Sequence, residues 1–229
     1  MSLSLAPFKY MNIMAKNGGP VERLIFSEIT SMDNEKIFEV GCYLKESLRS
    51  PNIEKNYLYG NPDGTGTDKH KSTACYKAIS EALERWAFYQ SSSLEYHRSG
   101  FDIDPSTTGM AAFPGLFKSQ ARSIAKLEAL ERWAIAEWWR GGVSAVSYDE
   151  FNQSSKNIVI EVADFGFVAI VWMPVDKTSD NHAYGFAAEQ SPALAVAKAR
   201  IELQRNIFVL KSYFEKESQI DLSILSLQE

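Results

Sequence analysis

The sequence predicts an α+β fold in which three repeated loop-helix units pack on a mixed, largely antiparallel sheet. A helical pattern of alanines and glutamates occurs three times in the 229 residues, and a glycine-containing loop precedes each copy. Runs rich in β-branched and aromatic residues lie between the second and third copies, as expected for strands. The length suits one domain, so we expect residues 1–229 to form a single unit.

Residues 1–56 carry the weakest pattern and remain unassigned. Residues 24–29 and 37–44 have the apolar character of two short strands, or of a strand and a helix, and their spacing does not decide between them. Residues 57–59 predict a brief strand, followed by the glycine-rich segment GNPDGTGTD. We interpret that segment as a turn before the first helix.

The three helices are predicted at about residues 69–90, 117–140 and 192–214. Gly141 and Gly142 predict the end of the second helix. Ser191 followed by Pro192 predicts the start of the third, because serine caps a helix and proline is favoured at its first position.

Residues 157–175 predict a hairpin or two adjacent strands, with a turn at the tripeptide Asp164, Phe165 and Gly166. The sequence of residues 185–188, GFAA, echoes GMAA at 109–112. We therefore expect the loop that enters the helix to be repeated together with the helix.

Glu81, Glu128 and Glu202 occupy the same position in the three helical repeats. Alanines stand seven and three residues before each glutamate, at Ala74, Ala78, Ala121, Ala125, Ala195 and Ala199. The first two copies continue as EALERWA and the third as ELQRN, so Arg205 takes the place of a second glutamate. On a helix these offsets return to one face, which therefore carries small residues, then carboxylates, then a guanidinium.

This face has two interpretations. A solvated face with Glu to Arg pairs one turn apart would contribute about 0.3–0.5 kcal/mol per pair. Three copies in one register instead favour close packing around a shared polar centre. The apolar residues beside the face, Leu83, Trp86, Leu130 and Trp133, are then expected to be buried.

A shared centre of carboxylates and arginines points to a magnesium nucleotide site. Carboxylates from several helices repel one another unless a cation lies between them, and Mg²⁺ prefers oxygen ligands while keeping water and phosphate in its shell. Arginine holds phosphate oxygens in a fork geometry. Positioning and charge neutralisation of this kind catalyse phosphoryl transfer.

Composition excludes several other classes. The net charge of −5 argues against a nucleic-acid binder. Cys42 and Cys75 are the two cysteines, which fits reduced thiols and gives no cysteine metal motif. His70, His97 and His182 lack metal-ligand spacing. No segment is apolar enough for a signal peptide or a membrane span, so we expect a cytoplasmic protein.

Three segments together resemble the YcaO-like proteins, over about residues 57–210. They are the helix ending EALERWAFY after a glycine loop, STTGMAAFPG with the helix ending EALERWA, and YGFAAEQSPALAVAKARIELQ after strands of the type VADFGFVAI. The resemblance implies an ATP- and Mg²⁺-dependent protein that phosphorylates a peptide backbone amide, so that a Cys, Ser or Thr side chain or sulfide yields an azoline or a thioamide.

The resemblance also implies roles for individual residues. The metal ligands or their supports would be Glu81, Glu84, Glu128, Glu131 and Glu202. The nucleotide contacts would be Arg85, Arg132 and Arg205, with Ser106 and Thr107 as further contacts and Thr108 where the family often has asparagine. No catalytic residue is assigned.

The chain departs from the family at Arg205, where glutamine is common, and in the short segment after the third helix, which lacks a proline-rich tail. A non-catalytic scaffold that binds a nucleotide or a partner is therefore the alternative function, and a structural domain held by internal salt bridges is a third. We expect a peptide or protein substrate, a partner chain that supplies the C-terminal part, and a homodimer.

Overall fold

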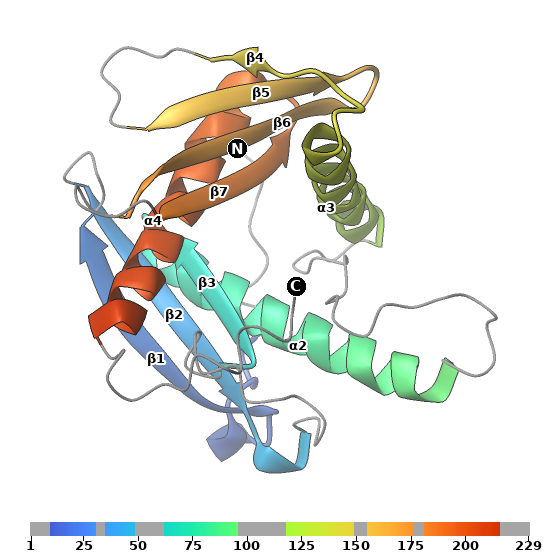
Figure 1. Ribbon diagram of the computed structural model, residues 1–229. Coiled ribbons are helices and arrows are strands. Elements are labelled where there is room, and N and C mark those ends of the chain that lie inside the picture. Colours follow the sequence, from blue (N-terminus) through green and yellow to red (C-terminus); the bar gives the residue numbers. More distant parts are fainter. Residues whose placement is uncertain are drawn as a thin grey trace.

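The computed structural model describes residues 10–30, 35–48, 62–95, 118–148, 155–175 and 181–215. These residues form two antiparallel sheets and three long helices, which confirms the predicted α+β class (Figure 1). The brief strand predicted at residues 57–59 lies outside the described residues. No helix in the described ranges is long and apolar enough to cross a membrane.

The first sheet contains β1 (Val21–Thr30), β2 (Lys36–Leu44) and β3 (Gly64–Asp68), in that order. Two short 3-10 helices, η1 (Ala15–Asn17) and η2 (Glu46–Leu48), flank β1 and β2 in sequence. Both ambiguous N-terminal stretches are therefore strands. Helix α2 (Lys71–Glu95) covers one face of this sheet, where Val40 and Cys42 pack against Ala78 and Ile79.

Residues 64–68 of the glycine-rich segment before α2 form strand β3, which corrects the prediction of a turn there. Gly64 and Gly66 alternate along β3 and face α2. A Cβ atom on Gly64 would lie 2.4 Å from the carbonyl oxygen of Ala78, and one on Gly66 would lie 2.1 Å from that of Ala74. Glycine is needed here because the helix backbone packs directly on the strand.

The second sheet contains β4 (Val146–Ser147), β5 (Lys156–Val162), β6 (Gly166–Pro174) and β7 (His182–Glu189), in that order. Strands β5 and β6 form the predicted hairpin, in which Asp164 and Gly166 have φ angles of 64° and 136°. The segment YGFAA is part of β7, so the prediction that it forms a helix-entry loop is wrong. Like β3, it is a strand that runs along a helix.

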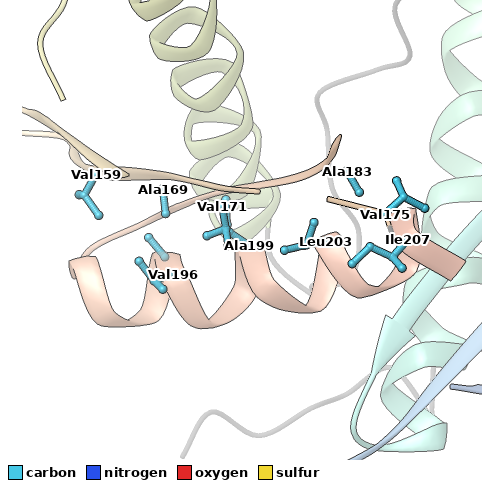
Figure 2. Packing of buried hydrophobic residues seen from close by; sticks show 11 residues of the cluster. Val159, Ala169, Val171, Val175, Ala183, Val196, Ala199, Leu203 and Ile207 are labelled. Atoms are coloured by element: carbon cyan, nitrogen blue, oxygen red, sulfur yellow. The ribbon is translucent and has the colours of Figure 1, made fainter. Parts of the chain in front are cut away.

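Helices α3 (Lys118–Trp139) and α4 (Pro192–Glu215) cover opposite faces of the second sheet. Residues at odd positions, such as Ala169 and Val171, contact Val196, Ala199 and Leu203 of α4 (Figure 2). Residues at even positions face α3, in a core built around Ala134, Ile160, Val168, Ile170 and Ala188. Both faces of the central strand β6 are therefore buried.

The observed helices agree with the predicted ones to within a few residues. Gly141 follows α3 with a φ angle of 77°, and its N–H donates to the carbonyl oxygen of Trp138. The predicted burial of Trp86 and Trp133 is wrong, since their exposed fractions are 37% and 48%. Trp139, at the end of α3, is 78% exposed.

Candidate functional site

Two of the three alanine pairs allow close contact between a helix and a strand. Ala74 and Ala78 on α2, and Ala195 and Ala199 on α4, are fully buried. On α3, Ala125 is half-buried, and the side chain of Ala121 is not described. The small residues therefore bring α2 onto β3 and α4 onto β7, as the repeated pattern predicted.

The glutamate that follows each close contact caps the free edge of a strand. No described strand pairs with the outer side of β3 or β7. An edge of this kind presents unpaired N–H groups. Glu81 accepts hydrogen bonds from the backbone nitrogen of Thr65 at 2.7 Å and from its hydroxyl at 3.0 Å. Glu202 accepts one from the backbone nitrogen of Phe186 at 3.0 Å.

These two units are equivalent position by position, at an offset of 121 residues. The offset takes Thr65 to Phe186 and Glu81 to Glu202. It also takes Gly64 to Gly185, at which an added Cβ would lie 2.0 Å from the carbonyl oxygen of Ala199. The two carboxylates are therefore placed by the same local structure, although the side chains that they meet differ.

The second helix adds its carboxylate to the same edge of β7. Glu131 on α3 accepts a hydrogen bond from the backbone nitrogen of Ala188 at 3.1 Å. Phe186 and Ala188 lie two positions apart on β7, so their N–H groups point to the same side of the strand. Helices on opposite faces of the second sheet thus converge on one strand edge.

The carboxylates of all three helices act on one another electrostatically. Burial raises the pKa of Glu84 to about 8, and the neighbouring charges of Glu128 and Glu81 add to the effect. Burial likewise raises the pKa of Glu131 to about 7, with contributions from Glu202 and Glu128, while the Ala188 N–H and an arginine oppose the shift. Glu84, Glu131 and their neighbours form what we call the carboxylate cluster: Glu81, Glu84, Glu128, Glu131 and Glu202.

Glu202 has a raised pKa as well. Burial is the largest cause, the Arg205 guanidinium and the Phe186 N–H oppose it, and the charges of Glu81 and Glu128 add to it. Because each of the three helices contributes to these effects, the cluster is a single electrostatic unit. A buried group of like charges costs free energy unless a cation or protons neutralise it.

Three arginines lie beside the cluster, but they are not equally engaged. Arg85 contacts Glu81 at 2.5 Å and Arg132 contacts Glu128 at 2.6 Å. Arg205 makes longer contacts, at 3.7 Å to Glu202 and 3.5 Å to the Thr65 hydroxyl. The buried Nε atoms of Arg205 and Arg85 both have no hydrogen-bond partner among the described residues. Arg205 therefore keeps donors that an anionic ligand would satisfy.

The structure places eight of the ten predicted site residues around the cluster. Ser106 and Thr107 lie outside the described residues, as does Thr108. Within the described parts of the chain, no three His, Cys, Asp or Glu side chains are gathered closely enough to hold a metal ion. The glutamates are thus electrostatic neighbours, and a bound cation would need to draw their side chains together.

Sequence reasoning missed the backbone groups and two side chains of the site. Thr65 contacts both Glu81 and Arg205, and the N–H groups of Phe186 and Ala188 bind carboxylates. Glu39 on β2 also belongs here, because burial raises its pKa and Arg205 opposes that effect. The GTG sequence around Thr65 was a usable signal, since its glycines mark the contact with α2.

Two antiparallel sheets, with three carboxylate-bearing helices meeting at their free edges, define the class of fold. It is the YcaO fold. Over 90% of this chain, the structure matches that of YcaO from Methanopyrus kandleri bound with AMPPCP and Mg²⁺, with a TM-score of 0.61 and 15% sequence identity. It also matches a heterocyclase in complex with substrate and cofactor, over 87% of this chain, with a TM-score of 0.52 and 15% identity.

The likeness is one of structure rather than of sequence. No family model and no curated protein matches the sequence. The chain spans 66% of the length of the M. kandleri protein and 39% of that of the heterocyclase. The expectation of a YcaO-like α+β fold, drawn from three sequence segments, is confirmed by these neighbours.

Proposed function

We propose that this protein binds ATP with Mg²⁺ at the carboxylate cluster and uses it to phosphorylate a backbone amide of a peptide. The observation that carries the proposal is geometric: Glu81, Glu131 and Glu202, from three different helices, accept hydrogen bonds at the free edges of β3 and β7. Burial and neighbouring carboxylates also raise the pKa values of Glu84 and Glu131. We assign this activity to a single YcaO-like domain over residues 1–229.

The donor set fits magnesium. Carboxylate oxygens are hard ligands of the kind that Mg²⁺ takes, and a cation would remove the repulsion among them. Glu81, Glu84, Glu128, Glu131 and Glu202 would hold the metal. When bound, the metal would neutralise phosphate charge during the transfer. Two fold neighbours support this assignment, since one carries AMPPCP and Mg²⁺ and the other a substrate and cofactor.

The arginines would hold the phosphates. Arg205 is the strongest candidate, because its contacts with Glu202 and Thr65 are longer than those of Arg85 and Arg132 with their glutamates. Arg85 and Arg132 hold Glu81 and Glu128 in place and would turn to phosphate oxygens when the metal takes those carboxylates. We also assign Ser106 and Thr107 to the nucleotide.

In the proposed reaction the amide oxygen bonds to the γ-phosphorus of ATP and the bond from that phosphorus to ADP breaks. A Cys, Ser or Thr side chain of the peptide, or sulfide, bonds to the amide carbon and loses its proton. The oxygen then leaves with inorganic phosphate, and in azoline formation the amide nitrogen loses its proton as the carbon–nitrogen double bond forms. The products are ADP, phosphate and an azoline or a thioamide, so the water equivalent lost from the amide is recovered in the phosphate.

One observation favours the alternative of a non-catalytic nucleotide-binding or partner-binding subunit. Arg205 stands at the position that corresponds to Glu84, so α4 brings one carboxylate where α2 and α3 each bring two. Such a subunit would bind Mg·ATP, or a partner that supplies a C-terminal part, without turnover. Self-association into a homodimer is compatible with either function.

Calorimetric titration of ATP, with and without Mg²⁺, tests the proposal on the wild-type protein, on Glu128→Gln and on Glu161→Gln. Glu161 is an exposed residue of β5 and serves as the matched control. We expect binding that requires Mg²⁺, disappears in Glu128→Gln and persists in Glu161→Gln. If the wild-type protein gives no heat of binding under any condition, the proposed nucleotide site is refuted. Binding without ADP release, across peptides containing Cys, Ser and Thr, would favour the non-catalytic alternative.

A further inference from the structure

Three aromatic rings form a row on the second sheet next to the carboxylate cluster. Trp172 on β6 and Tyr184 on β7 are direct cross-strand partners, with ring centroids 6.4 Å apart and planes at 21°. Tyr184 and Phe186 are two positions apart on β7, with centroids 6.3 Å apart and planes at 5°. The three rings are therefore nearly parallel and stand on the face of the sheet that also packs against α3.

The row reaches the site through the backbone of β7. The N–H of Phe186 donates to Glu202, and the carbonyl oxygen of Tyr184 accepts a hydrogen bond from Asn206, the neighbour of Arg205, at 2.7 Å. Two residues of a strand span about 7 Å. The backbone of Tyr184 thus lies about 7 Å along β7 from the N–H group that Glu202 binds.

The rings differ in how far they are covered. Trp172 and Phe186 are half-buried, whereas Tyr184 is 38% exposed although it lies between them. If the three aromatic residues only filled the core, the side chain in the middle of the row would be expected to be covered rather than exposed to solvent. Flanking rings that fix the orientation of an accessible one make a preformed stacking surface, of the kind on which nucleobases lie.

We propose that the Trp172–Tyr184–Phe186 row stacks the base of the nucleotide whose phosphates meet the carboxylate cluster. This inference rests on the proposed nucleotide function and names the subsite for the base. Phosphate and metal contacts come from the glutamates and arginines, and the aromatic row supplies affinity for the heterocycle. Stacking of one base on an aromatic side chain corresponds to an affinity change of about tenfold.

The test compares Mg·ATP with Mg·tripolyphosphate, which has the phosphates but no base, by calorimetry. Tyr184→Ala and Tyr184→Leu should weaken Mg·ATP binding about tenfold and leave Mg·tripolyphosphate binding within about twofold. Tyr184→Phe keeps the ring and should bind both as the wild type does. Phe165→Ala removes an exposed ring at the β5–β6 turn and is the matched control. The leucine variant keeps an apolar side chain in case the alanine variant does not fold.

The outcomes separate this inference from the function on which it rests. Equal weakening of both ligands, or no weakening of ATP, would overturn the base subsite while leaving the phosphate site intact. A wild-type protein that binds both ligands with the same affinity would overturn it in the same way. A wild-type protein that binds neither ligand would overturn the subsite and the proposed function together.

Discussion

Replacing Glu131 by glutamine is expected to stabilise the ligand-free protein above neutral pH. The folded state holds this carboxyl with a pKa of about 7 instead of 4.5, so folding opposes its ionisation. For a raised carboxyl pKa, the free energy of unfolding falls as pH rises from about 4.5 to 7 and is level above that range. Glutamine carries no charge, and its amide oxygen can still accept the hydrogen bond from the Ala188 N–H. The variant should therefore not lose unfolding free energy as the pH rises.

The pKa difference sets the size of the effect. A pKa of about 7 in place of 4.5 corresponds to an upper limit of about 3 kcal/mol at pH 8. Screening by solvent at a half-buried site reduces the expected gain to about 1–2 kcal/mol. At pH 5 the gain should shrink to about a quarter of its value at pH 8, because the folded carboxyl is then already protonated.

Urea unfolding of the wild type, Glu131→Gln and the exposed control Glu161→Gln, at pH values from 5 to 8.5, measures the difference. The same Glu131→Gln protein should have lost ATP turnover, since a neutral amide is a poor magnesium ligand. A variant that is less stable than the wild type at pH 8, or that gains equally at pH 5 and pH 8, would refute the view that burial, with added repulsion from Glu202 and Glu128, opposes the ionisation of Glu131.

Two further predictions follow from the same geometry. Mg·ATP binding should tighten between pH 6 and pH 8.5 and release protons, because the carboxyls of Glu84 and Glu131, with pKa values of about 8 and 7, must ionise to bind the metal. Calorimetry in buffers of different ionisation enthalpy measures the number of protons released. Binding that is independent of pH would contradict this prediction. Gly185→Ala should lower the free energy of unfolding by at least about 2 kcal/mol, since its Cβ would lie 2.0 Å from the carbonyl oxygen of Ala199. Gly41→Ala, whose Cβ would meet its nearest atom at 3.3 Å on a proline side chain, is the comparison and should cost clearly less in the same urea experiment.

The sequence predicted the three helices and the register of their glutamates, because both depend on the local helical period. It did not predict β3, because glycine alternating with threonine is typical of a turn unless the helix that packs on it is known. Trp86 and Trp133 were expected in the core because they are large apolar residues beside the glutamate-bearing face, but both side chains are exposed. Their position beside the repeated face of each helix is set by the sequence of that helix, whereas their burial depends on which other element covers it.

The bonds from the cluster to the strand edges could not be predicted from residue types. Phe186 and Ala188 take part through their backbone N–H groups, which every residue except proline carries. Their roles come from the position of β7 at the end of its sheet and from the side chains that α3 and α4 bring to it. Backbone contributions of this kind become visible only when the topology is known.

The caps on β3 and β7 also have a consequence for solubility. An uncovered strand edge is a template for pairing with a strand of another molecule, and charged side chains placed over it prevent such pairing. Glu81, Glu131 and Glu202 accept hydrogen bonds from the outward N–H groups of these edges, so the groups assigned to ligand binding also oppose intermolecular β-sheet formation. Alanine at these positions would expose backbone donors, and protein lost to aggregation would then be mistaken for protein with an inactive site.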